Sequence, residues 1–443
     1  MRRCVWQKPV GLRYDHAPAF KVGRRTRGFP IGSLEDMRSI LLLSLAPWLF
    51  VAGQSKTTSD YVELTSGKRM NGRVVFEGNS TVVLETGRGE LEYDAADVKL
   101  VHSVERSLKE YLERFDALQR QDLGATTALA LWCERNDLPN EAHNLWLRIL
   151  LADPQNAQAF KAVGARKAGK KIELPAERGW IDLEEYVGAK AKWRDALHFS
   201  TTHFDIETDA PLEKLLDASV AVERHYLRFY AALRQELVLY AFDERPVLRF
   251  YAKAKDFPES LRGGDNIWFE PRENVLHILT TEKQDLPQVV RSVTDMLLFN
   301  ACRRSSGKSG QVPGWVAGAI GEVFAATAPA EPFGKWGDFG VPVKTWFQAQ
   351  AADPDPLELK TLLRSSLAEL RRGSDATRRS TAAYTLGHFL VRGDGGVHRG
   401  DFFKYLRGAW TGKINTRDLY KALGMTEDEL NKRWRAYIEA NAR

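Results

Sequence analysis

Residues 287–301 read PQVVRSVTDMLLFNA, and residues 312–324 read VPGWVAGAIGEVF. In the first stretch the apolar residues recur at the spacing of one face of a helix. The second stretch is a dense run of small and apolar residues that begins after a proline, as a helix often does. A polar segment rich in Ser, Gly and basic residues separates them. The sequence therefore predicts two packed helices that are joined by a polar loop.

The two stretches resemble the active-site core of the gluzincin metallopeptidases, the peptidase MA-like kind. In that family the first helix carries His-Glu-x-x-His, and the second segment reads Pro-x-Trp-Leu-x-Glu-Gly. Pro313 and Trp315 keep the second pattern. The positions that match the metal ligands and the general base are Thr294, Asp295, Leu298 and Gly318. The resemblance implies the scaffold of a metallopeptidase without its metal-binding set.

The residues at these positions explain why peptidase chemistry is not expected. A zinc peptidase needs two imidazoles one helical turn apart, a third ligand, and an open position for water. Leu298 and Gly318 have no donor atom, and Thr294 offers only a hydroxyl. Asp295 keeps a carboxylate at the base position, but there is no metal-bound water for it to deprotonate. We therefore expect no catalytic residue, no metal and no cofactor here.

An active hydrolase with relocated ligands is the alternative. Glu322 lies one helical turn past Gly318, and His388 lies on a later predicted helix. A metal site built from Asp295, Glu322 and His388 is conceivable, although nothing in the spacing of these residues predicts it. Other histidines that such a site might use are His203 and His277. If the site has instead become a binding groove, the candidate residues are Trp315, Glu322 and His388.

The positive charge of the chain is concentrated in residues 1–53, which hold nine Lys or Arg residues and three acidic ones. This accounts for the whole net charge of +6, so the rest of the chain gives no reason to expect a nucleic-acid partner. Residues 40–52 form an apolar run of signal-peptide length, too short for a comfortable membrane span. With Met37 as the true start, the segment predicts export to the periplasm or the cell exterior and no stable membrane span after cleavage. An uncleaved anchor or a buried core segment is the alternative.

Residues 54–105 alternate apolar and polar residues in short runs that are separated by glycine-rich turns. The pattern predicts a small antiparallel β-barrel of SH3-like size. A plain β-meander without a binding role is the alternative.

Residues 106–196 change to helical periodicity and then to a connector. The residues at the spacing of a tetratricopeptide repeat are Leu129, Ala130, Ala142, Trp146 and Pro154. One or two such repeats cannot form a long concave groove, which favours a helical spacer over a peptide-binding surface. Cys133 lies in this segment and Cys302 lies in the next one. A disulfide between them is possible, but their spacing gives no support for it.

Residues 197–443 continue the peptidase MA-like resemblance. A strand over residues 199–208, a long helix, a second strand over residues 247–251 and a hairpin around Pro271 are predicted before the first motif helix. This is the element order of the gluzincin N-terminal subdomain. The chain is predicted to be helical from about residue 355, with Tyr384 and Trp434 as fold-level markers of the family. The predicted fold is an α+β multidomain protein: a small β-barrel, a short TPR-like segment, and a zincin-like domain with a helical C-terminal part.

These observations predict an exported, non-catalytic protein with a metallopeptidase-like scaffold that binds a peptide or protein partner. Two alternatives remain beside it. One is the active hydrolase with relocated ligands. The other is an envelope scaffold that acts through the β-barrel and the TPR-like segment.

Overall fold

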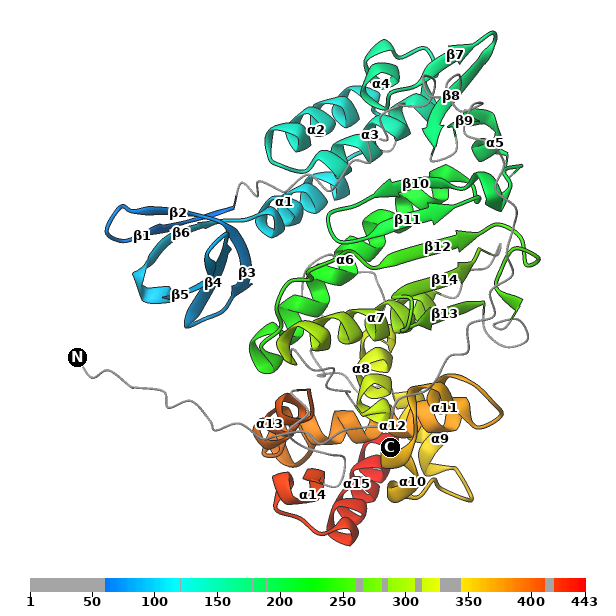
Figure 1. The fold of residues 1–443 in the computed structure, drawn as a ribbon. Coiled ribbons are helices and arrows are strands. Elements are labelled where there is room, and N and C mark those ends of the chain that lie inside the picture. Colours follow the sequence, from blue (N-terminus) through cyan, green and yellow to red (C-terminus); the bar gives the residue numbers. More distant parts are fainter. Residues whose placement is uncertain are drawn as a thin grey trace, which may run out of the picture. The chain divides into compact units, whose positions relative to one another are not determined.

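The computed structural model describes residues 60–119, 121–176, 179–188, 190–259, 266–280, 286–306, 313–326, 344–410 and 418–443. All of these lie in one compact unit, residues 57–443 (Figure 1). The predicted signal peptide, including Met37 and the apolar run 40–52, lies outside the described residues. Within them the fold is mixed α and β. Of the helices that are described, none combines the length and the apolar character needed to cross a membrane.

The N-terminal strands form two separate sheets. The strands are β1 (Tyr61–Leu64), β2 (Arg69–Asn71), β3 (Arg73–Glu77), β4 (Thr81–Thr86), β5 (Gly89–Asp94) and β6 (Val98–His102). One antiparallel sheet has the order β2-β1-β6, and the other has the order β3-β4-β5. Neither sheet closes on itself or on the other within the described residues, so the predicted small barrel is wrong, although the predicted strands are present. Strand β2, which is short and polar, was not predicted.

The chain crosses from one sheet to the other at two points. Gly72 separates β2 from β3, and a Cβ there would lie 2.4 Å from the backbone oxygen of Glu85, so only glycine fits this crossing. A single turn of 3₁₀ helix, Ala95–Asp97, separates β5 from β6. The sheets face each other through a small apolar cluster. Its buried members are Val62, Val82, Leu84 and Val101. Because the contact is made by side chains rather than by a hydrogen-bonded ladder, the barrel stays open.

The next segment contains four helices followed by a small sheet. The helices are α1 (Val104–Asp116), α2 (Leu123–Arg135), α3 (Pro139–Ala152) and α4 (Ala157–Ala162). Ala130 and Ala142 are buried where α2 and α3 pack together, and the Trp146 indole donates to Glu134 Oε1 at 2.9 Å. The predicted connector contains a three-stranded sheet that the sequence did not indicate. Its strands, with the short helix that follows them, are β7 (Arg166–Ala168), β8 (Lys171–Ala176), β9 (Gly179–Asp182) and α5 (Leu183–Val187).

A five-stranded mixed sheet follows, with the order β10-β11-β12-β14-β13. Its strands are β10 (Leu197–Ser200), β11 (Asp205–Thr208), β12 (Val247–Tyr251), β13 (Ile267–Glu270) and β14 (Val275–Leu279). The three inner strands are parallel, and both edge strands are antiparallel to their neighbours. The hairpin predicted around Pro271 is confirmed as β13 and β14. The run 199–208, which was predicted as one strand, folds back on itself because Thr201 donates its N–H to the carbonyl of Phe204.

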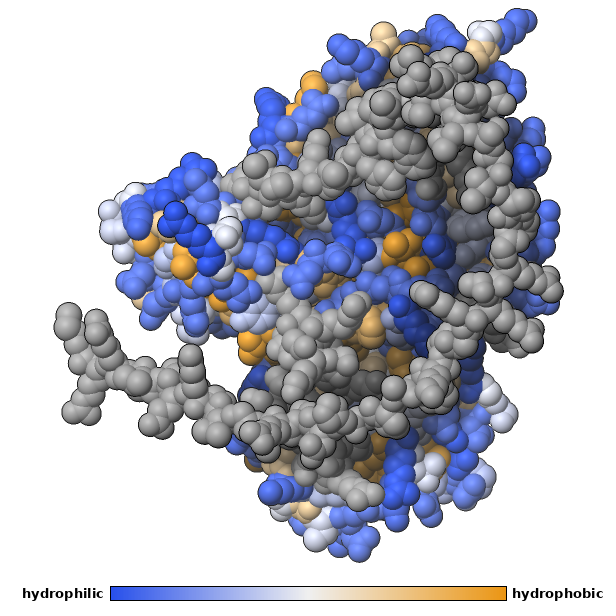
Figure 2. Space-filling model, viewed as in Figure 1, coloured by the Kyte–Doolittle hydropathy of each residue, from blue (hydrophilic) through white to orange (hydrophobic). Residues whose placement is uncertain are grey.

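Helices make up most of the remaining fold (Figure 1). They are α6 (Leu212–Leu237), α7 (Leu286–Ser306), α8 (Gly314–Ala326), α9 (Lys344–Ala351), α10 (Leu359–Arg364), α11 (Leu367–Arg371), α12 (Ala376–Arg392), α13 (Arg399–Trp410), α14 (Asp418–Leu423) and α15 (Glu427–Ala442). Helix α7 packs against β13, β14 and α8, and α8 also packs against α11 and α12. One apolar core extends from α1 to α15. On the face shown in Figure 2, outside the grey atoms, hydrophilic residues predominate and hydrophobic ones appear in separate small groups.

Polar contacts fix α3 to the turn between β10 and β11. Asn140 and Asn144 donate to the backbone oxygens of Thr201 and Ser200 at 2.9 and 3.1 Å. Between these two residues, buried Glu141 accepts from the N–H and the hydroxyl of Thr202, both at 2.8 Å. Burial raises the pKa of Glu141 to about 7, and the nearby carboxylate of Glu223 adds to the rise. This turn is therefore held by a carboxyl group that titrates near neutral pH.

We predict that the stability of the protein falls as the pH rises through about 7. The folded-state pKa of Glu141 lies above its ordinary value of 4.5, so the group contributes stability below that value and loses it as the carboxyl ionises. Glu141→Gln is expected to flatten this dependence, as measured by urea unfolding at pH 5, 6, 7 and 8. Exposed Glu113 on α1 provides the matched control, since Glu113→Gln is expected to keep the wild-type slope. Equal slopes for the two variants would refute the assignment.

Candidate functional site

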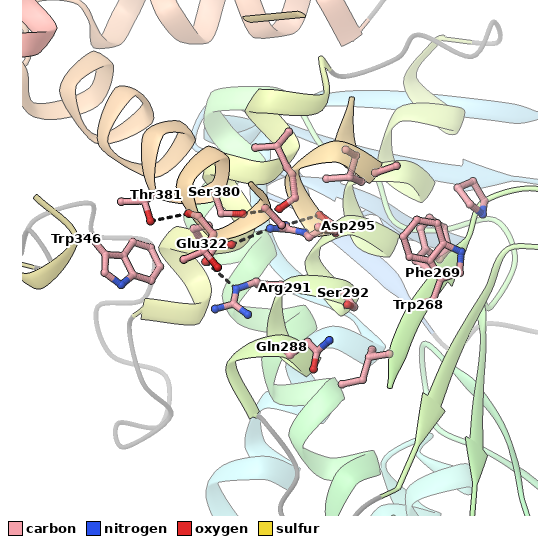
Figure 3. A pocket seen from close by; sticks show the side chains of 18 residues that line it. Trp268, Phe269, Gln288, Arg291, Ser292, Asp295, Glu322, Trp346, Ser380 and Thr381 are labelled. Carbon is pink, nitrogen blue, oxygen red and sulfur yellow. Dashed lines mark hydrogen bonds and ion pairs between the residues drawn. The ribbon is translucent and has the colours of Figure 1, made fainter. Parts of the chain in front are cut away.

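A cavity of about 570 Å³ lies beside the two motif helices, between them and the edge strand β13. Its aromatic walls are provided by Trp268 and Phe269 from β13 and by Trp346 from α9. Figure 3 shows how polar side chains of α7, α8 and α12 face these walls. They are Gln288, Arg291, Ser292, Asp295, Glu322, Thr377, Ser380 and Thr381. The cavity thus combines aromatic walls with polar groups between them, and such a combination is the usual character of a binding site.

A reciprocal amide pair holds the β13–β14 hairpin against α7. The side chains of Asn274 and Asn300 exchange two hydrogen bonds of 2.9 Å each. Asn274 has a φ of 57°, a left-handed conformation that Asn tolerates better than most residues. The Asn300 amide also donates to the Met296 carbonyl one turn earlier on α7. The wall of the cavity is therefore fixed to the helix that forms its floor.

Thr294, which the sequence resemblance matched to a metal-binding histidine, is fully buried and bonded within the protein. Its hydroxyl donates to the Val290 carbonyl at 2.7 Å, and it lies 2.8 Å from Nε2 of His225 on α6. Because the hydroxyl proton is already used, Nε2 of His225 must be the donor in this bond. Burial lowers the pKa of His225 to about 3, and Arg228 adds to the effect, so the ring is neutral at neutral pH.

Two carboxylates and two guanidinium groups meet where α7, α8 and α11 come together (Figure 3). Arg371 donates from Nε and Nη2 to the two oxygens of Asp295, each at 3.2 Å. Its Nη1 donates to Glu322 at 2.8 Å, and Arg291 donates from Nε to the other oxygen of Glu322 at 2.7 Å. Only about a tenth of the Arg371 side chain is exposed, and the two carboxylates are more deeply buried. Each carboxylate oxygen accepts at least one charge-assisted hydrogen bond.

Burial tends to shift the pKa values of the acidic and the basic groups of this cluster in opposite directions. It raises the pKa of Asp295 above its usual range, although Arg371 opposes the rise. Burial also acts to lower the pKa of Arg371, but the adjacent Asp295 and Glu322 outweigh it, and the net direction is upward. Arg371 is therefore firmly cationic and supplies the charge that its two carboxylate partners need.

Three glycines on one face of α8 make room for the segment that carries Arg371. Gly314, Gly318 and Gly321 are spaced so that they lie along a single face. A Cβ on Gly314 would meet backbone atoms of residues 365–367 at 2.5–2.6 Å. A Cβ on Gly318 would lie 2.9 Å from the Leu370 side chain, and one on Gly321 would lie 2.5 Å from Nη2 of Arg371. The space next to Gly318 is thus taken by the Leu370 side chain.

Local hydrogen bonds set the start and the end of α11. Ser366 and Glu369 form a capping box, in which the Ser366 N–H donates to the Glu369 carboxylate at 2.8 Å and the Glu369 N–H donates to the Ser366 hydroxyl at 3.2 Å. Ser380 on α12 donates to the Leu370 carbonyl at 2.6 Å. The next residue, Arg372, stacks over the Trp268 ring at 3.6 Å. The segment that carries Arg371 therefore contacts α12 through Leu370 and β13 through Arg372.

The structure brings together only some of the residues that the sequence predicted for this site. Asp295 and Glu322 line the cavity, whereas Thr294, Leu298 and Gly318 do not. Two of the predicted groove residues are core residues. Trp315 is fully buried near Phe402, and His388 is buried with its Nδ1 2.8 Å from the Tyr437 hydroxyl.

The remaining histidines that were considered as ligands are bonded elsewhere. His203 contacts Glu223 at 2.7 Å, and His277 contacts the Tyr251 hydroxyl at 2.9 Å. Neither of them lines the cavity. In the part of the chain that the structure describes, no group of three or more His, Cys, Asp or Glu residues is arranged to hold a metal ion. Cys133 is a buried free thiol.

Sequence reasoning missed Arg291, Arg371, Trp268 and His225. The glycine spacing at 314, 318 and 321 was a usable signal, because small residues repeated on one helix face allow another segment to approach closely. Nothing local to Arg371 marks it as the partner of Asp295, from which it is 76 residues distant along the chain.

Comparison of the chain with protein-family models, with curated proteins and with solved structures finds no match.

We predict that Arg371→Met lowers the free energy of unfolding by about 3–5 kcal/mol, because it leaves Asp295 and Glu322 buried without their shared cation. Neutralising the partners as well, in the triple variant with Asp295→Asn and Glu322→Gln, is expected to restore most of the loss. Equilibrium unfolding in guanidinium chloride measures both. Arg378→Met, which removes an ion-paired arginine on α12 outside the cavity, is the control and is expected to have a much smaller effect. A triple variant less stable than Arg371→Met would contradict this account.

We also predict that Gly321→Ala destabilises the protein. Alanine is favoured over glycine inside a helix by about 1 kcal/mol, but the new methyl group would collide with a guanidinium that two carboxylates hold in place. Gly400→Ala on α13 is the matched control, because a Cβ there meets no atom within 4 Å, and it is expected to stabilise by roughly 0.5–1 kcal/mol. Thermal and urea unfolding give the sign for each. A Gly321→Ala protein as stable as the wild type would show that Arg371 can move aside.

Proposed function

We propose that this chain is a non-catalytic protein with a metallopeptidase-like scaffold, and that its cavity binds a peptide or a segment of a protein partner. The observation that carries the proposal is the Arg371 guanidinium, which bridges Asp295 on α7 and Glu322 on α8. In a gluzincin peptidase the corresponding helices hold a divalent cation between them. Here a side chain of the protein supplies the positive charge.

The donor set supports the loss of catalysis. The two carboxylates in the cavity are bonded to Arg371, so a metal ion would have to displace a buried guanidinium to reach them. The space next to Gly318 is taken by the Leu370 side chain. Thr294 is engaged with His225 and with the helix backbone. These residues build a stable polar floor, and none of them is placed as a nucleophile or a base beside an open coordination position.

The order of the elements supports the scaffold part of the proposal. A mixed sheet with an antiparallel edge strand precedes two packed helices, and the cavity lies between that strand and the helices. This is the order that the family resemblance implies. The aromatic side chains of β13 and α9 provide apolar contact area, and the helices provide hydrogen-bonding groups. An extended peptide presents both kinds of surface, which makes it the ligand class that the cavity suits best.

Export belongs to the same proposal and rests on the N-terminal sequence. The apolar run 40–52 follows Arg38 and ends in small residues, as a signal peptide does. A protein that is exported in this way meets peptides and partner proteins of the cell envelope.

We predict that purified wild-type protein binds peptides without cleaving them. The probe is a degenerate pool of fluorescein-labelled octapeptides, followed by fluorescence anisotropy, with mass spectrometry of the pool after incubation. Thr377→Trp places a large side chain at the cavity and is expected to abolish binding. Thr361→Trp changes an exposed threonine of α10 outside the cavity, and it is the matched control that should bind as the wild type does.

Two results would contradict the proposal. Stoichiometric zinc in the purified protein, together with cleaved peptides, would make the chain a peptidase with relocated ligands. Equal binding by Thr377→Trp and Thr361→Trp would move the peptide away from the cavity.

A further inference from the structure

The side chains of the cavity offer a ligand more hydrogen-bond donors than acceptors. All four oxygens of Asp295 and Glu322 already accept from guanidinium nitrogens. The three nitrogens of Arg371 are all used in these bonds. The carboxylates of the cavity therefore have their charge satisfied within the protein, and a ligand cation would find no unpaired anion there.

Arg291 differs from Arg371. Only its Nε is engaged, on Glu322, and 23% of its side chain is exposed. In the part of the chain that the structure describes, its terminal nitrogens Nη1 and Nη2 have no partner, and they are not among the buried unbonded atoms. Figure 3 shows Arg291 between Glu322 and the side chains of Gln288 and Ser292 on α7. Arg291 lines the cavity, so four N–H groups of a lining guanidinium are unbonded within the described residues.

Hydroxyl groups add neutral donors on both sides of the cavity. Ser292 follows Arg291 on α7, and Thr377 of α12 also lines the cavity. In the described residues neither hydroxyl has a hydrogen-bond partner. A guanidinium edge with neighbouring hydroxyl donors is the arrangement that recognises the planar, two-oxygen carboxylate group.

The segment that follows the capping box connects two sides of the cavity. Arg371 contacts α7 and α8, and Arg372 stacks on Trp268 of β13, so consecutive residues link the helices to the edge strand. The end of a peptide needs less space beside this link than a chain that continues past it. The link therefore favours a peptide terminus as the part of the ligand that lies near the helices.

We propose that Arg291 binds a carboxylate of the ligand, and that in a peptide ligand this group is the C-terminal carboxylate. The inference rests on the proposed function and specifies its ligand. An aspartate or glutamate side chain offers the same chemistry, so the experiment must separate the two sources. The aromatic walls then contact the last side chains of the peptide.

The test compares three pools of labelled octapeptides on the full-length mature protein by fluorescence anisotropy. The first pool has free C-termini, the second is amidated, and the third is amidated and contains Glu at a fixed internal position. A charge-assisted hydrogen bond at this site is worth about tenfold or more in affinity, so the first pool is expected to bind at least about tenfold tighter than the second. The third pool is expected to bind as weakly as the second.

Arg291→Met is expected to abolish the difference in affinity between the free and the amidated pools. Arg378→Met on α12 is the matched control and keeps the tenfold difference. Arg291 also bonds Glu322, so circular dichroism and unfolding verify that the variant is folded. The comparison of pools on the wild type needs no variant and decides the question even if Arg291→Met does not fold.

The possible outcomes distinguish a failure of this inference from a failure of the proposed function. Equal affinity of the wild type for the free and amidated pools overturns the carboxylate site and leaves peptide binding intact. Tighter binding of the third pool than of the second overturns the assignment to the C-terminus and makes a side-chain carboxylate the ligand. Binding of none of the pools overturns both proposals.

Discussion

The packing of α7, α8 and α11 against one another depends on the guanidinium of Arg371. Two carboxylates on neighbouring helices repel each other, and their burial removes the water that would screen them. A buried ion pair offsets its desolvation only when its geometry is good and its remaining atoms are hydrogen-bonded. Here Arg371 binds Asp295 with two nitrogens and Glu322 with the third. Arg291 donates a hydrogen bond to the other oxygen of Glu322. The cation therefore fixes the position of α11 against α7 and α8, and with it the floor of the cavity.

Space and charge act together at this point. The glycines of α8 remove the side chains that would keep α11 at a distance, and the approach that they allow brings Leu370 and Arg371 to the positions that they occupy. Neither feature is sufficient alone. Without the cation, close packing would leave the two carboxylates buried and unpaired. Without the glycines, Arg371 would not reach the carboxylates. The capping box at Ser366 gives α11 its register, so that Arg371 rather than a neighbour faces the cluster.

The sequence predicted the parts of the fold that local patterns determine. The helix pair, the strand Val247–Tyr251 and the hairpin around Pro271 follow from periodicity and turn residues. The open N-terminal sheets and the sheet in the connector were not foreseen, because strand pairing depends on contacts that no local pattern records. At the site, the sequence identified Asp295 and Glu322 but not their arginine, which is distant along the chain. It also placed Trp315 and His388 in a groove, since residue type alone does not tell which face of a helix is buried.

Leu370 has a consequence for substitution at position 318. A glutamate there would need the volume that the leucine side chain fills, so a single substitution would disturb the packing of α8 against α11. A larger side chain at this position could be accommodated only if a smaller one replaced Leu370. The two positions are therefore expected to vary together, if they vary at all.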